Sequence, residues 1–109
     1  MNLINPYRFA AAVGGIPRDD LIAEYLFDTN ADDTSGSTNV HNGTLVNASV
    51  TGGVLLLDGT GDYVSISDSD DFSFTDGAGN DTACSISMWF NCDLAVGTAQ
   101  RLITKFNGT

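Results

Sequence analysis

The sequence predicts a single all-β domain, an antiparallel β-sandwich or barrel, and three observations favour this fold class. The chain has 109 residues, which is enough for one small hydrophobic core but not for two. Its acids are all aspartate except Glu24, and aspartate favours turns and caps over helix interiors. Short apolar or alternating runs are separated by polar turns that contain glycine, which is the pattern of short antiparallel strands.

Six runs have the composition or the period of a β-strand: residues 21–27, 44–50, 54–57, 63–67, 83–90 and 101–106. Between the third and the fourth run lies a glycine-rich turn, residues 58–62, which predicts that these two strands pair as a hairpin. Residues 28–39 and 51–53 are two further predicted turns. Residues 1–20 hold both prolines and show neither the helix nor the strand period, so we expect an extended arm.

The clearest predicted strand covers residues 83–90, because its side chains alternate without a break. One face carries Cys84, Ile86, Met88 and Phe90, and the other carries Ser85, Ser87 and Trp89. We expect Ile86, Met88 and Phe90 to be buried in the core. Trp89 shares its face with two serines and is the candidate ligand-binding residue, since sugar C–H faces stack on aromatic rings. The alternative is that Trp89 packs in the core.

The acids have few cationic partners along the chain. The net charge is −10, and between Asp19 and Gln100 there is no lysine or arginine. The acids of this span must therefore be solvated, hydrogen-bonded to backbone N–H groups in turns, or bound to a metal ion. A surface this negative repels phosphate backbones and anionic lipids, so we expect neither nucleic acid nor a membrane as a partner.

Calcium is the cofactor that suits this uncompensated acidic span. Residues 28–33 begin like a calcium loop of the D-x-N-x-D type, but the EF-hand positions for glycine and glutamate hold Asp33 and Asn39. A calcium site of another type would use Asp28, Asp58 and Asp62 as ligands. A plain solvated turn is the alternative.

No group of residues predicts catalysis, so we expect a protein that is not an enzyme. His41 is the only histidine and has no partner base or nucleophile in the pattern, so we assign it to a loop or turn. Paired acids such as Asp70 and Asp71 lie in polar turns without the burial that acid catalysis requires. Cys84 and Cys92 would lie roughly 26 Å apart on one extended strand, too far for a disulfide.

Five segments, in order, resemble the laminin-G-like branch of the concanavalin A-type jelly rolls. They are LIAEYLFD (21–28), NGTL (42–45), LLLDGTGDYV (55–64), CSISMWF (84–90) and QRLITK (100–105). The resemblance implies an antiparallel jelly-roll β-sandwich formed by residues 21–109. It also implies a sandwich incomplete at the C-terminus, because the family's domain is longer than this chain. Leu57 and Cys84 depart from the family's usual residues at their positions.

The first residues, MNLINPYRF, resemble the openings of tailed-phage structural proteins. This resemblance implies that residues 1–20 are an attachment arm for other virion subunits, with contacts from Leu3, Ile4, Tyr7, Arg8 and Phe9. The apolar run 9–16 has no leucine and no preceding cluster of lysine or arginine, so it does not predict a signal peptide. Assembly in the cytoplasm, as for a virion protein, agrees with that expectation.

Together, these features predict a non-enzymatic virion protein, namely a fibre, tail or decoration component. Many copies of the sandwich would bind glycans or proteins, each weakly, and multivalency would make the adhesion strong. One alternative is a secreted bacterial carbohydrate-binding module of a larger glycosidase or adhesin, which would be extracellular. A second alternative is a purely architectural capsid subunit.

Overall fold

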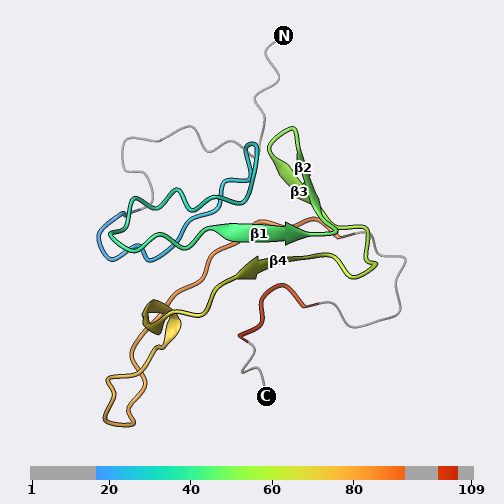
Figure 1. Cartoon of the computed structure of the whole chain (residues 1–109). Helices are drawn as coiled ribbons and strands as arrows, with labels where there is room; N and C mark the ends of the chain where they lie inside the picture. The colour runs from blue at the N-terminus through green and yellow to red at the C-terminus, as the bar shows by residue number, and fades with distance from the viewer. Residues whose placement is uncertain (1–16, 93–100, 106–109) are drawn as a thin grey trace.

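The computed structural model describes residues 17–92 and 101–105 of the chain (Figure 1). These residues form four short β-strands and one turn of 3-10 helix, and they contain no α-helix. The predicted all-β class is therefore confirmed. Of the predicted arm, residues 1–20, only residues 17–20 are described, and its predicted contact residues lie outside the described residues: Leu3, Ile4, Tyr7, Arg8 and Phe9.

The first sheet pairs two strands that are distant in sequence. Strand β1 (Gly43–Val46) runs antiparallel to β4 (Tyr63–Ile66), with Leu45 opposite Val64 (Figure 1). Gly43 also donates its N–H to the carbonyl oxygen of Ala31 at 2.8 Å. Ala31 is 2% exposed and is the one buried apolar residue of the described chain. The described core is therefore thin and lies where residue 31 meets the start of β1.

The second sheet is a hairpin of adjacent strands. Strand β2 (Ser49–Thr51) pairs with β3 (Val54–Leu56) through the loop Gly52 and Gly53, whose φ angles are 62° and 77°. Two consecutive positive φ angles are typical of the type I′ turn, which matches the twist of the flanking strands. The predicted turn at 51–53 is confirmed, but the predicted hairpin of 54–57 with 63–67 is wrong, because β3 pairs with β2 and β4 with β1.

The predicted strand 44–50 is broken near its middle. Asn47 has a φ of 52°, in the left-handed region that asparagine tolerates better than most residues. Its Nδ2 donates to the carbonyl oxygen of Gly61 at 3.3 Å, which ties the break to the turn 58–62. Strands β1 and β2 therefore belong to different sheets.

The predicted strand 21–27 is not a strand in the structure. The backbone of Glu24 bonds to the loop that follows it: its N–H donates to Asp33 Oδ1 at 3.1 Å, and its carbonyl oxygen accepts from the Thr34 N–H at 2.8 Å. Phe27 adopts a φ of 52°, which ends the extended run before residue 28. This run is apolar, but the backbone of Glu24 bonds to the loop rather than to another strand.

Residues 83–90 and 101–105 are also outside both sheets. Ile86, Met88 and Phe90, expected in the core, are 59%, 42% and 61% exposed. Alternation predicts which side chains share a face, but it does not supply a partner strand. Within the described residues, no helix is long and apolar enough to cross a membrane.

A single turn of 3-10 helix, η1 (Asp70–Phe72), follows β4. Ser69 caps it, because the serine hydroxyl accepts the N–H of Asp71 at 3.3 Å. At its other end the ammonium of Lys105 donates to the carbonyl oxygen of Phe72 at 2.9 Å and to Ser73 Oγ at 3.2 Å. Lys105 therefore links the far end of the described chain to η1.

Candidate functional site

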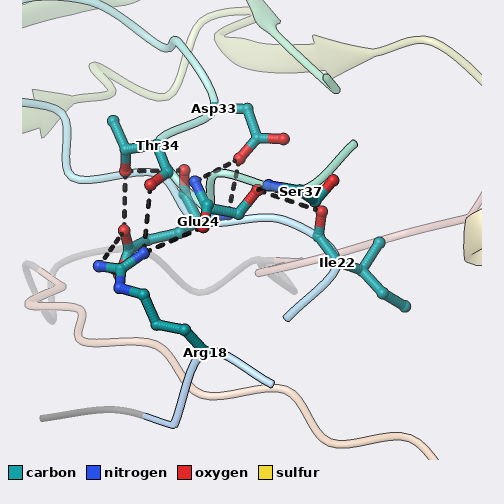
Figure 2. A network of polar contacts seen from close by, with 7 residues as sticks. Arg18, Ile22, Glu24, Asp33, Thr34 and Ser37 are labelled. Carbon is teal, nitrogen blue, oxygen red and sulfur yellow. Dashed lines mark hydrogen bonds and ion pairs between the residues drawn. The ribbon is translucent and has the colours of Figure 1, made fainter. Parts of the chain in front are cut away.

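The residues before β1 fold into a polar loop, residues 18–42, that is held by side chains (Figure 2). Arg18 donates from Nη2 to both carboxylate oxygens of Glu24, at 3.0 and 3.2 Å, and from Nη1 to the carbonyl oxygens of Thr34 and Ser35 at 3.2 Å each. The hydroxyl of Thr34 donates to Glu24 Oε2 at 2.9 Å. The Glu24 side chain is 12% exposed and the Arg18 side chain is 55% exposed, so only the carboxylate of this ion pair is shielded from water.

Asp33 organises the centre of the loop through backbone N–H donors. Its Oδ1 accepts from Glu24 at 3.1 Å and from Ser35 at 2.9 Å, and its Oδ2 accepts from His41 at 3.0 Å. Desolvation raises the pKa of this carboxyl, but the hydrogen bonds from Ser35, His41 and Glu24 outweigh it and lower the pKa to about 2. One carboxylate therefore joins three separate points of the loop.

His41 connects the loop to η1. Its ring is buried, its Nε2 lies 2.8 Å from Asp71 Oδ2, and its centroid lies 4.6 Å from that of Phe72. The same Asp71 oxygen accepts from Asn39 Nδ2 at 2.8 Å. The hydrogen bonds from Asn39 and then from His41 lower the pKa of the Asp71 carboxyl. The predicted loop position of His41 is confirmed, and the structure adds that the side chain is a buried link.

Tyr25 also contacts the end of the loop, at His41. Its hydroxyl donates to the carbonyl oxygen of His41 at 2.5 Å, and its ring stacks on Phe27 with centroids 6.1 Å apart. Burial, and then the nearby charge of Asp33, raise the pKa of Tyr25 to about 12. The phenol therefore stays protonated at neutral pH and keeps its hydrogen bond.

An open pocket of about 570 Å³ lies beside this link, between the end of the loop and the residues that follow β4. His41 and Val40 contribute to it, but most of its lining is hydroxyl, amide and carboxylate side chains: Thr38, Asn39, Asn42, Ser67, Asp68 and Ser69. Such groups can donate and accept hydrogen bonds to a polar, hydroxyl-rich ligand. The sequence analysis did not select this pocket, because its two sides come from segments about 30 residues apart.

Two of the three predicted calcium ligands lie in one turn. Asp58 Oδ1 accepts the N–H of Thr60 at 2.8 Å, and Asp62 Oδ2 accepts the N–H groups of Asp58 and, at 2.9 Å, of Gly59. The Asp62 Oδ1 atom is buried and has no hydrogen-bond partner among the described residues. The bond from Thr60, followed by the contact with Asp62, lowers the pKa of Asp58.

Asp28, the third predicted ligand, lies elsewhere, beside Gly53 in the β2–β3 hairpin. Among residues 17–92 and 101–105, no three His, Cys, Asp or Glu side chains gather as a metal-binding group. The structure therefore places Asp58 and Asp62 together and does not join Asp28 to them. The calcium site stays a prediction.

Trp89, the predicted ligand-binding residue, is 78% exposed and is not among the residues that line the pocket. Exposure is what a stacking platform needs. The alternative, in which Trp89 packs in the core, does not agree with this exposure.

The residues that the sequence analysis missed are Arg18, Asp33 and Asp71. One local signal was present for Asp33, because an aspartate two residues before Ser35 can accept that residue's N–H in an Asx turn. Of the three states expected for the acids of this span, bonding to backbone N–H groups is observed at Asp33, Asp58 and Asp62. Glu24 and Asp68 differ from that expectation, because they pair with Arg18 and Lys105 from outside the span.

No family model, curated protein or solved structure matches this chain. The laminin-G-like resemblance and the phage-like arm therefore stay predictions.

Proposed function

We propose that this chain is a non-enzymatic display component of a virion, in a fibre, tail or decoration position, and that it binds glycans or proteins. We further propose that the short antiparallel strands are part of a jelly-roll β-sandwich of the concanavalin A type. The observation that carries the proposal is the order of five laminin-G-like segments along the chain. The turn at 58–62 supports it, because the DGTGD segment there forms a tight, carboxylate-bonded turn before β4.

A glycan is the ligand class that the open pocket supports best. Its amides, hydroxyls and single carboxylate match the hydroxyl groups of a sugar, and a shallow polar site binds weakly. Weak sites become effective when many copies act together, as on a virion surface. Trp89 would add a stacking contact at a separate position of the same surface protein.

Removal of the arm is expected to keep the protein out of virions. The deletion covers residues 2–16, because Arg18 holds the folded loop through Glu24 and must stay. In the phage that carries the gene, mass spectrometry of purified particles should find the full chain and miss the shortened one. Particles without the protein should adsorb to host cells several-fold more slowly.

The matched control is a full-length chain with Asp19→Asn, an exposed change next to the deletion boundary that leaves the arm intact. Normal incorporation of the shortened chain would contradict the arm's role. Particles that lack the protein yet adsorb normally would contradict adhesion, and failure of particles to form at all would favour the architectural alternative. A leader peptide and a catalytic domain in the same gene would favour the secreted bacterial module.

Calcium is expected to stabilise the fold through Asp58 and Asp62, with backbone carbonyls and water completing the shell. When the free calcium concentration is one hundred times the dissociation constant, bound calcium raises the free energy of unfolding by about 2.7 kcal/mol. Thermal melting with calcium and with a chelator measures it. Asp62→Asn should abolish the difference, whereas Asp68→Asn, at a side chain that is 87% exposed, should preserve it. Equal midpoints with and without calcium would leave both acids as turn residues.

A further inference from the structure

A second open pocket, of about 390 Å³, adjoins the open pocket that His41 lines. The two pockets share Thr38 and Asn39, so these two residues lie between them. Their volumes, about 570 and 390 Å³, fall within the range of about 300–1,000 Å³ that is usual for small-molecule sites. Together the two pockets therefore have room for an extended ligand that crosses residues 38 and 39.

Apart from His41, the charged side chains that line these pockets are all carboxylates. Asp68 lines the first pocket, and Asp20 and Asp71 line the second. No lysine or arginine of the described chain lines either pocket. The His41 Nε2 already contacts Asp71 Oδ2 at 2.8 Å. An acidic sugar would therefore approach three carboxylates without a free cationic partner.

Arg18 and Lys105 do not supply that partner. Arg18 is held within the polar loop by its bonds to Glu24. The Lys105 ammonium donates to the Phe72 carbonyl oxygen at 2.9 Å and lies 3.7 Å from Asp68 Oδ1. The Asp68 side chain is 87% exposed, and such an exposed ion pair contributes little. The Asp68 carboxylate can therefore still accept a hydrogen bond from a ligand.

Asp71 keeps one carboxylate oxygen available to a ligand. The bonds from Asn39 Nδ2 and His41 Nε2 both end on its Oδ2, and Oδ1 accepts no bond from the described residues. The Asp71 side chain is 32% exposed, so solvent and ligands reach it. The same two bonds hold residues 39–41 against η1 before a ligand arrives, and such preorganisation lowers the entropic cost of binding.

We propose that the two pockets bind a glycan chain that carries free amino groups, whose ammonium groups pair with Asp20, Asp68 and Asp71. This inference rests on the proposed glycan-binding function and names the class of glycan. An ammonium group donates three hydrogen bonds, and its bonds to carboxylates are stronger than those between neutral groups. The hydroxyl and amide side chains of the pockets pair with sugar hydroxyls, which favours an amino sugar over a polyamine.

Isothermal titration calorimetry of the full chain tests the class of glycan. The probes are oligomers of glucosamine, N-acetylglucosamine and galacturonic acid, matched in length, in a mildly acidic buffer of low salt that protonates the amines. The glucosamine oligomer should bind about three- to tenfold more tightly than the acetylated one, because several exposed charge pairs each add a small contribution. The galacturonic acid oligomer should bind most weakly. Added salt should reduce the preference for glucosamine, because it screens exposed charges.

A pair of substitutions assigns this preference to the pockets. Asp20→Asn with Asp68→Asn removes one carboxylate from each pocket and should reduce the preference to less than about twofold. Asparagine tolerates the φ of 65° at position 20. The matched control is Asp19→Asn with Asp70→Asn, which removes the same charge from exposed neighbours that line neither pocket and should keep the preference.

Four results would overturn the proposal. Equal loss of preference in both pairs of substitutions would mean a general effect of the acidic surface rather than pairing in the pockets. Equal affinity for the glucosamine and N-acetylglucosamine oligomers would exclude selection of amino groups and leave glycan binding standing. Spermidine that binds as tightly as the glucosamine oligomer would mean that the pockets select positive charge and not a sugar. If none of the three oligosaccharides binds, the proposed glycan-binding function fails and this inference fails with it.

Discussion

Replacement of Asp33 by asparagine is expected to lower the free energy of unfolding by about 2–3 kcal/mol, since hydrogen bonds to a charged group contribute about 1.5–3 kcal/mol. The carboxylate accepts backbone N–H groups from Glu24, Ser35 and His41, which lie on three parts of the loop. An amide keeps one acceptor oxygen and turns an NH₂ group toward the remaining donors, so at least one N–H loses its partner. Urea unfolding measures the change through its midpoint.

Asp32→Asn is the matched control, because this exposed neighbour accepts, within the part of the chain that the structure describes, only the side-chain amide of Asn30, at 2.6 Å. It should change the unfolding free energy by less than about 0.5 kcal/mol. Equal effects of the two substitutions would contradict a structural role for Asp33.

The same residue sets a pH dependence whose sign follows from its pKa. The pKa of Asp33 is lowered from 3.8 to about 2 in the folded chain, so its contribution is complete above pH 4. That contribution is lost as the pH falls from about 4 to about 2, because the unfolded chain binds the proton first. The difference in stability between the unmodified chain and Asp33→Asn should therefore shrink over this interval. A constant difference from pH 6 to about pH 2 would mean that the Asp33 carboxylate is not held by these bonds.

Gly43→Ala is expected to cost about 1–3 kcal/mol of unfolding free energy, as overpacking does at a filled site. A Cβ at this position would lie 2.6 Å from Val64 Cγ1, and 3.1 Å from both the Cβ and the carbonyl oxygen of Ala31. The Ala31 carbonyl oxygen accepts the N–H of Gly43 itself, so a backbone shift that relieved the steric clash would weaken this hydrogen bond. Val64 has little rotamer freedom with which to move aside.

A double-mutant cycle with Val64→Ala isolates the steric contribution. Removal of Cγ1 should relieve most of the clash, so the double variant should lose less stability than the sum of the two single losses. Thermal or urea unfolding of the four chains supplies the cycle. Strict additivity would show that the added methyl group does not meet Val64.

Local features of the fold were predictable where the determinants are neighbours in sequence. The Gly52–Gly53 turn requires positive φ angles, and the strand that begins at Tyr63 follows a turn rich in aspartate and glycine. Strand pairing was not predictable in the same way. The alternative hairpin of 54–57 with 63–67 has acceptable turn chemistry, and the shorter two-residue loop between β2 and β3 forms instead.

The candidate site depends on contacts that no local pattern contains. His41 and Asp71 meet across 30 residues, and the two sides of the open pocket are similarly distant. Composition limited the acids without cationic neighbours in sequence to three states, and bonding to backbone N–H groups is one of them. Which aspartate accepts three such N–H groups depends on the path of the loop. Residues 21–27 have the apolar composition of a strand, and that composition does not indicate that the Glu24 backbone bonds to Asp33.

The span of the Lys105 contact has a consequence for folding during synthesis. Arg18 and Asp33 find their partners within 17 residues, so the loop can form as soon as the chain emerges from the ribosome. Strand β1 can pair only after β4 has been translated. The carbonyl oxygen of Phe72 can accept its bond only after a further 33 residues, when Lys105 has been translated. Among the described contacts, the bond from the Lys105 ammonium to η1 is therefore the last for which both partners have been translated.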